Sequence, residues 1–178
     1  MRFSCESGTG AYHSPAVSYN RAQPMSEPYA SVIPTFPLFE GFTAHGAQRL
    51  IEHGEIKQVP AGSVIFNEGE AASVVLLVLA GDLQVFVQRD GNDVVLAGAA
   101  PGMIVGELAV LCGIPRSASV RAAVDSTVLE WAAASFRRLL LSDVLLSQRI
   151  FGQALRGLVD KERSLIEALT KAGRAATS

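Results

Sequence analysis

Short β-prone runs alternate with glycine turns from Glu55 to Ala132, and this rhythm constrains the fold more than any other feature of the chain. Valine-rich runs flank Asp90-Gly91, a dipeptide that favours a tight β-hairpin. Strand-sized runs that recur about every ten residues are typical of sandwiches and barrels. The sequence therefore predicts a mainly β domain with strands near 56–59, 63–66, 74–79, 82–88, 93–98, 117–124 and 127–132.

Helical patterns flank this β region. Thr43 is a candidate N-cap, because Leu50 and Ile51 follow it on one helical face. After Ser135, apolar residues recur every three or four positions, which predicts terminal helices. The expected organisation is a disordered leader over 1–30, a β domain with its N-terminal helix over 31–142, a helix that closes the site or dimerises over 143–170, and a flexible tail over 171–178.

The composition excludes several classes of function. The net charge is −2, from 15 basic and 17 acidic residues without a basic cluster, so no nucleic-acid partner is expected. The longest apolar run, Val74 to Ala80, is too short to cross a bilayer, so we expect no membrane contact by this chain itself. Cys5 and Cys112 form neither a disulfide framework nor a zinc spacing, which favours a cytoplasmic protein without a metal. Whether translation starts at Met1 or at Met25 stays open.

The stretch GELAVLCGIPRSASVRA, residues 106–122, carries the chemistry of the chain. Gly106 opens a short helix whose first N–H groups favour anions, and Arg116 offers a planar fork for a phosphate. Glu107 would repel a plain phosphate, but it fits a ligand that also carries hydroxyl donors. A cyclic 3′,5′-phosphate has such a donor in the free 2′-hydroxyl of its ribose. The structural alternative is a buried ion pair between Glu107 and Arg116.

This stretch resembles the phosphate-binding cassette of cyclic nucleotide-binding domains, which occur in catabolite activator protein, in the regulatory subunits of cAMP-dependent protein kinase and in cyclic-nucleotide-gated channels. Upstream, PLFEGF resembles the family's N-terminal anchor, and PAGSVIFNEGE and LAGDLQVF match its glycine turns. The resemblance spans residues 34 to 170. It implies a double-stranded β-helix, or jelly-roll, barrel with a short cassette helix and C-terminal helices.

The resemblance also implies site roles. Glu107 would bind the ribose hydroxyl and Arg116 the cyclic phosphate. The family closes a C-terminal helix over the purine, and Leu155, Val159 and Arg163 are candidates for this lid, although the motif does not fix their register. The implied ligand-binding residues are Gly106, Glu107, Leu108, Ala109, Arg116, Ser117 and Ala118.

The expected function is that of a cyclic nucleotide receptor or regulatory module. We expect cAMP as the ligand, and cGMP stays open because Ser117 lies where a hydroxyl can help to bind guanine. No enzyme is expected, since all three histidines precede the β region and no set of catalytic groups is assembled. A helix-turn-helix is not expected either, because the chain ends eight residues after Thr170.

The signal is expected to leave through the C-terminal helices, to a protein partner or within a homodimer. Their apolar stripe fits two arrangements, packing on the chain's own barrel or a helix–helix dimer seam. A degenerate module that keeps the barrel only for protein contact is the alternative function. The stripe consists of Phe151, Leu155, Leu158, Leu165 and Leu169, with Glu162 in its gap.

Overall fold

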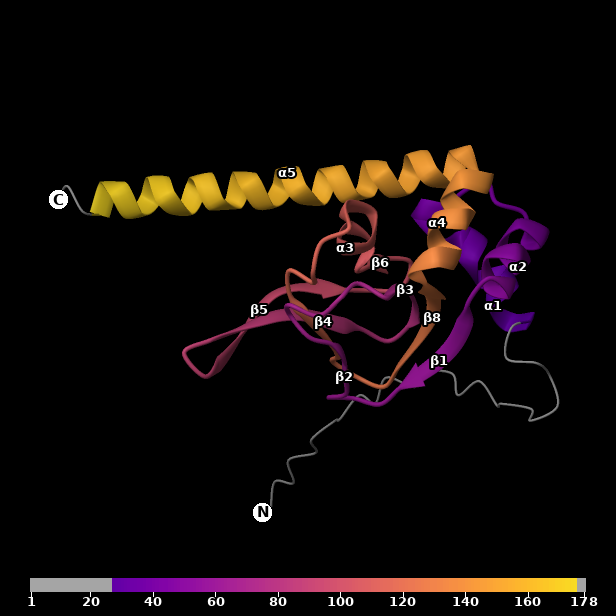
Figure 1. Cartoon of the computed structure of the whole chain (residues 1–178), viewed down its shortest axis with the longest axis horizontal. Helices are drawn as coiled ribbons and strands as arrows, with labels where there is room; N and C mark the ends of the chain where they lie inside the picture. The colour runs from indigo at the N-terminus through magenta and orange to yellow at the C-terminus, as the bar shows by residue number, and fades with distance from the viewer. Residues whose placement is uncertain (1–26, 176–178) are drawn as a thin grey trace, which may run out of the picture.

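The structure is a computed structural model that describes residues 27–175; the predictions made for 1–26 and 176–178 lie outside this range. Within it, eight strands form two four-stranded antiparallel sheets, of order β1-β8-β3-β6 and β2-β7-β4-β5 (Figure 1). The predicted mainly β jelly roll with flanking helices is confirmed. The strands are β1 (Glu55–Val59), β2 (Val64–Phe66), β3 (Val74–Ala80), β4 (Leu83–Arg89), β5 (Asn92–Ala99), β6 (Ile104–Val105), β7 (Ser119–Ala122) and β8 (Ser126–Ala132).

Helices precede, interrupt and follow the strands. The predicted cap is present, because Oγ1 of Thr43 accepts a hydrogen bond of 3.1 Å from the backbone N–H of Gly46. The first helix begins at Glu27, inside the leader expected over 1–30, and the last runs to Ala175, past the boundary expected at 170. In the part of the chain described, no helix combines the length and the apolar character needed to cross a membrane. The helices are α1 (Glu27–Val32), η1 (Ile33–Thr35), η2 (Pro37–Phe39), α2 (Ala44–Glu52), α3 (Glu107–Cys112), α4 (Ala133–Ser142) and α5 (Val144–Ala175).

Strand β3 is the shared wall between two apolar cores. Val75, Leu77 and Leu79 pack with the helices, whereas Leu76 and Val78 point between the two sheets. Successive side chains of a strand point to opposite faces, so a strand covered on both faces needs an unbroken apolar run. This explains the sequence VVLLVLA of β3.

The N-terminal helices and α4 cover the outer face of the β1-β8-β3-β6 sheet. Trp131 of β8 is 1% exposed, and its indole Nε1 donates a hydrogen bond of 2.8 Å to the backbone oxygen of Leu50. The Trp131 ring also lies against Phe136 of α4, with 5.8 Å between centroids. These contacts hold α2, β8 and α4 together at the end of the domain where α5 begins.

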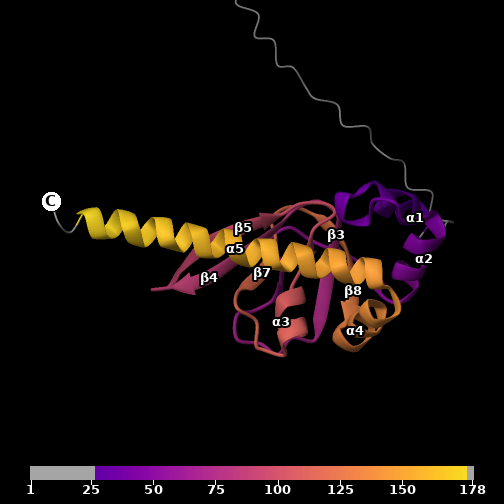
Figure 2. The same ribbon diagram turned by 90° about the horizontal axis from the view of Figure 1, so that it is seen from above.

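Helix α5 crosses above α3 and continues beyond it, on the side to which the β4–β5 hairpin also extends (Figures 1 and 2). The apolar stripe of α5 faces solvent. Packing of the stripe on the chain's own barrel, one of the two expected arrangements, is therefore wrong. The exposed fractions are 46% for Phe151, 61% for Leu155, 46% for Leu158, 61% for Leu165 and 64% for Leu169.

Candidate ligand-binding site

A cavity of about 170 Å³ brings together every predicted cassette residue. Strands of both sheets, α3, the segment that links α3 to β7, and one residue of α5 form its walls. Most of its lining is apolar or glycine, and its ionisable lining residues are Glu107, Arg116 and Lys161. The predicted residues that line it are Gly106, Glu107, Leu108, Ala109, Arg116, Ser117 and Ala118.

Gly106 lies where β6 passes into α3. Strand β6 pairs with β3 through Ile104 and Val105, and this two-residue strand was missed in the sequence because it is too short to show alternation. Gly106 has φ +83°, a backbone conformation that glycine adopts without steric cost. A Cβ at this position would lie 2.6 Å from Nη1 of Arg116. The glycine therefore allows both the turn and the close approach of the guanidinium.

Arg116 is a buried cation, 3% exposed. Its Nη1 donates to the backbone oxygen of Gly106 at 2.8 Å, and its Nη2 donates to the backbone oxygen of Val74 at 2.6 Å. The guanidinium also lies over the Phe66 ring, with Cζ 3.9 Å from the centroid. Its Nε, also buried, has no hydrogen-bond partner among the residues described. Buried polar groups are nearly always paired, so this N–H is a donor that is available to a bound ligand.

The backbone of Arg116 is held as firmly as its side chain. Its N–H donates to the oxygen of Glu70 at 2.9 Å, and its own oxygen accepts from the N–H of Gly69 at 2.8 Å. The turn between β2 and β3 therefore fixes the segment that carries the guanidinium. The Arg116 pKa is lowered by burial, an effect opposed by the charges of Glu70 and Glu107. Because the ordinary pKa of arginine is so high, the side chain stays charged.

Glu107, the first residue of α3, is half-buried beside this cation. Burial raises the pKa of its carboxyl, because charge is costly away from water. Its own backbone N–H and that of Leu108 oppose the shift, as do the charges of Lys161 and Arg116. Within residues 27–175, no ion pair joins Glu107 to Arg116, so the buried ion pair offered as an alternative is not formed.

The structure does not bring the candidate lid residues to this cavity. Leu155 and Val159 are 61% and 52% exposed, Arg163 is also exposed, and none of the three lines it. The α5 residue that does is Lys161, which the sequence motifs did not reveal. Two positions along a helix turn a side chain by about 200°, so Lys161 lies on the face opposite Val159 and Arg163.

The packing of α5 explains why Lys161 reaches the cavity. Leu146, Ile150 and Ala154 are 2%, 1% and 5% exposed, and they mark the buried face of α5. Continuing this face by three and then four residues gives Gly157 and Lys161. The candidate lid residues came from the family resemblance, which does not fix the register of this helix, and the apolar stripe belongs to the solvent face.

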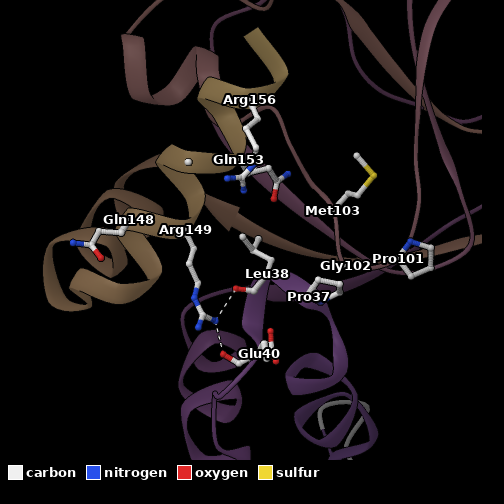
Figure 3. A pocket seen from close by; sticks show the side chains of 11 residues that line it. Pro37, Leu38, Glu40, Pro101, Gly102, Met103, Gln148, Arg149, Gln153 and Arg156 are labelled. Carbon is white, nitrogen blue, oxygen red and sulfur yellow. Dashed lines mark hydrogen bonds between the residues drawn. The ribbon is translucent and has the colours of Figure 1, made fainter. Parts of the chain in front are cut away.

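A larger cavity of about 570 Å³ lies between η2, the turn at Pro101-Gly102 and the first half of α5 (Figure 3). Nη1 of Arg149 donates to the backbone oxygens of Leu38 and Glu40 there, which fastens α5 to the N-terminal segment. Met103 lines both this cavity and the cassette cavity. The motif residues do not face this cavity, so its size alone does not make it the candidate site.

The side chains of the cassette cavity suit the binding of an organic anion. Across residues 27–175, no group of three or more His, Cys, Asp or Glu side chains could hold a metal ion. One buried guanidinium, one carboxylate and one lysine surround a small apolar space that also holds Ser117. This combination is able to recognise an anion that carries hydroxyl groups and an apolar surface.

Comparison with known proteins finds a domain family that matches the segment holding every lining residue of the cavity except Lys161. Residues 56–143 match the sequence model of the cyclic nucleotide-binding domain. An uncharacterized ABC transporter ATP-binding protein of Mycobacterium tuberculosis is 36% identical over 87 residues, 48% of this chain and 26% of that protein. A cAMP-dependent protein kinase regulatory subunit of Blastocladiella emersonii is 34% identical over 96 residues, 53% of this chain and 24% of that protein.

The fold has solved counterparts as well. The catabolite activator protein of Thermus thermophilus superposes with a TM-score of 0.66 and 25% identity, over 72% of this chain and 61% of that one. The chain spans only about a quarter of the length of the curated relatives it matches. The likeness is therefore to one domain of these relatives and not to their whole architecture.

Proposed function

Because its residues 56–143 belong to the cyclic nucleotide-binding domain family, we propose that this chain is a cyclic nucleotide receptor or regulatory module with cAMP as its ligand. The name of the Blastocladiella emersonii relative, a cAMP-dependent protein kinase regulatory subunit, supports cAMP as the first nucleotide to test. Ser117 lines the cavity, and its hydroxyl can help to bind guanine, so cGMP is the second nucleotide to test. The expected setting is the cytoplasm.

One observation carries the proposal: the buried Arg116 lines the same cavity as Glu107 and keeps an unpaired Nε. In this proposal the guanidinium binds the cyclic phosphate and the carboxylate accepts a hydrogen bond from the ribose 2′-hydroxyl. The backbone N–H groups of Ser117 and Ala118 are further donors for the phosphate. The apolar walls, among them Phe66, Val85 and Val120, surround the rest of the ligand.

Ligand binding is expected to displace α5. The cavity of about 170 Å³ is smaller than the roughly 300–1,000 Å³ of typical small-molecule pockets. Lys161 lines it from α5, so a nucleotide that enlarges the cavity has to push against this helix. Arg149 fastens the start of α5 to Leu38 and Glu40, so the expected motion is a tilt about this end. The exposed stripe of α5 would then present a changed surface to a protein partner or to a second copy.

Calorimetric titration with cAMP and with cGMP tests the proposal. Arg116→Ala is expected to weaken binding by about 2–5 kcal/mol, the usual cost of removing one side of a buried charged contact. Arg121→Ala is the matched control, since this arginine also lies over a phenylalanine ring, that of Phe86, but pairs with Gln84 and Asp93 outside the cavity. Equal affinities in the two variants would exclude the assignment of Arg116.

A module used only for protein contact is the second candidate. It is favoured by the Nη groups of Arg116, which already donate to the oxygens of Gly106 and Val74, and by the exposed stripe on α5. The wild-type chain would then bind neither nucleotide at millimolar concentration. That result would favour the exposed stripe of α5, rather than the cavity, as the functional surface.

A further inference from the structure

We infer that Lys161 of α5 is a ligand-binding residue that supplies the second positive charge of the cassette cavity and so sets its preference for a monoanionic ligand. This inference rests on the proposed function and deepens it. Lys161 is exposed to solvent and lines the cavity from α5, more than forty residues after the last cassette residue in the sequence.

The charge balance of the cavity carries the inference. The formal charges of Glu107 and Arg116 cancel, so the side chains of the cassette alone carry no net charge. Lys161 brings the net formal charge of the lining to +1, which matches the single negative charge of a cyclic phosphodiester. Without Lys161, the repulsion between Glu107 and the phosphate would oppose the attraction between Arg116 and the phosphate.

The interaction of Lys161 with Glu107 points the same way. The lysine charge lowers the pKa of Glu107, against the effect of burial. It therefore helps to keep the carboxylate ionised and able to accept a hydrogen bond. Lys161 belongs to α5, whereas Glu107 belongs to α3. A ligand that contacts both side chains would therefore connect the cassette to the helix that is expected to move.

The two arginines of α5 that lie nearest to Lys161 in the sequence do not offer this charge to the cavity. Arg156 lines the larger cavity, and Arg163 lines neither cavity. These two arginines make the assignment testable, since each can lose one positive charge from the same helix. Arg156→Gln is the charge-matched control, and Arg163→Gln tests the competing lid assignment.

Lys161→Gln is expected to weaken cAMP binding by about fivefold in low salt, as for a partly exposed charge contact. Lys161→Arg should restore most of the affinity, and Arg156→Gln should change it by less than about twofold. The loss in Lys161→Gln should shrink when the salt concentration rises, because salt screens exposed charges. Calorimetry at low and at high salt measures all of these, and circular dichroism confirms that each variant is folded.

Three results would overturn the inference. The first is an affinity of Lys161→Gln equal to that of the Arg156→Gln control, and the second is a loss as large in high salt as in low salt. The third is a loss confined to Arg163→Gln, which would favour the opposite face of α5. In each case wild-type binding stays intact, so the proposed function survives. If the wild-type chain binds neither cAMP nor cGMP, the proposed function and this inference fall together.

Discussion

Gly106 and Arg116 are fitted to one another: the backbone oxygen of the glycine accepts a 2.8 Å hydrogen bond from the guanidinium, and a Cβ on the glycine would lie 2.6 Å from the same nitrogen. The turn that starts α3 and the cation that lines the cavity therefore depend on each other. A change at either residue should disturb both the fold of the turn and the site.

Gly106→Ala should lower both stability and ligand affinity. An alanine at positive φ costs about 1–2 kcal/mol, and the clash with Arg116 adds about 1–3 kcal/mol. Gly91→Ala is the matched control, because Gly91 has φ +77° but open space around it. Urea unfolding and cAMP titration of both variants measure the difference. Equal losses of stability, with cAMP affinity unchanged in both variants, would show that the contact with Arg116 is unimportant.

The carboxyl of Glu107 should make the ligand-free protein less stable as pH rises. Its folded-state pKa is raised above the ordinary 4.5 by burial, so the folded state binds more protons than the unfolded state between the two pKa values. Stability should therefore fall as pH rises from about 4.5 through the raised pKa. Glu107→Gln should remove this fall and bind cAMP more weakly.

Urea unfolding of wild type and Glu107→Gln from about pH 4 to about pH 8 checks the sign. The Glu107→Gln variant should be the more stable of the two at the upper end of this range, since a glutamine side chain is never charged. A variant that is less stable than wild type there would mean that the carboxylate has favourable contacts that outweigh its burial. Arg116 and Lys161 are the cations that would supply them.

Leu158→Glu should disrupt self-association through α5. Leu158 is 46% exposed and lies in the middle of the apolar stripe, where a charge would enter any helix–helix seam. Leu141→Glu on α4 is the control, since Leu141 is 86% exposed and lies outside the stripe. Sedimentation should show a dimer for wild type and for Leu141→Glu, and a monomer for Leu158→Glu. A monomeric wild type would instead favour a different protein as the occupant of the stripe.

Arg149→Ala should loosen the start of α5. The variant loses the hydrogen bonds to Leu38 and Glu40 and the approach of the guanidinium to the Phe42 ring, 5.9 Å from its centroid. We expect a loss of about 1–3 kcal/mol and faster amide exchange in the first turns of the helix. Arg138→Ala is the control, since this exposed arginine donates only a 3.4 Å bond to Ser135. Unchanged exchange in Arg149→Ala would refute the role of Arg149 as an anchor.

The sequence predicts most of the fold because its local signals agree with the tertiary structure. The turn at Asp90-Gly91, the cap at Thr43 and the apolar run of β3 each favour the element that forms. Strand β6 escapes prediction because its two residues pair only through contact with β3, which no local pattern reveals. Helix α1 begins inside the expected leader, because the polar composition of residues 1–30 predicts disorder and six residues are too few to show a helical pattern.

The cassette could be predicted and the contribution of α5 could not, for one physical reason. The cassette residues lie within thirteen positions of one another, so a motif in the sequence keeps them together. Lys161 reaches the same cavity only through the way α5 packs, which depends on Ile150 and Ala154. The family resemblance left the register of the helix open, and two of the three candidate lid residues, Val159 and Arg163, lie on the side opposite Lys161.

The length of α5 means that a small displacement near the cavity would become a larger one at the far end of the helix. The helix has 32 residues, and at 1.5 Å per residue its far end lies about 39 Å from Arg149, whereas Lys161 lies only about 18 Å from it. A rigid rod pivoting at that arginine would roughly double any displacement imposed at the lysine by the time it reached Ala175. Under the proposed motion of α5, a shift of one or two ångströms at the ligand would become a movement large enough to break or make side-chain contacts at a distant surface.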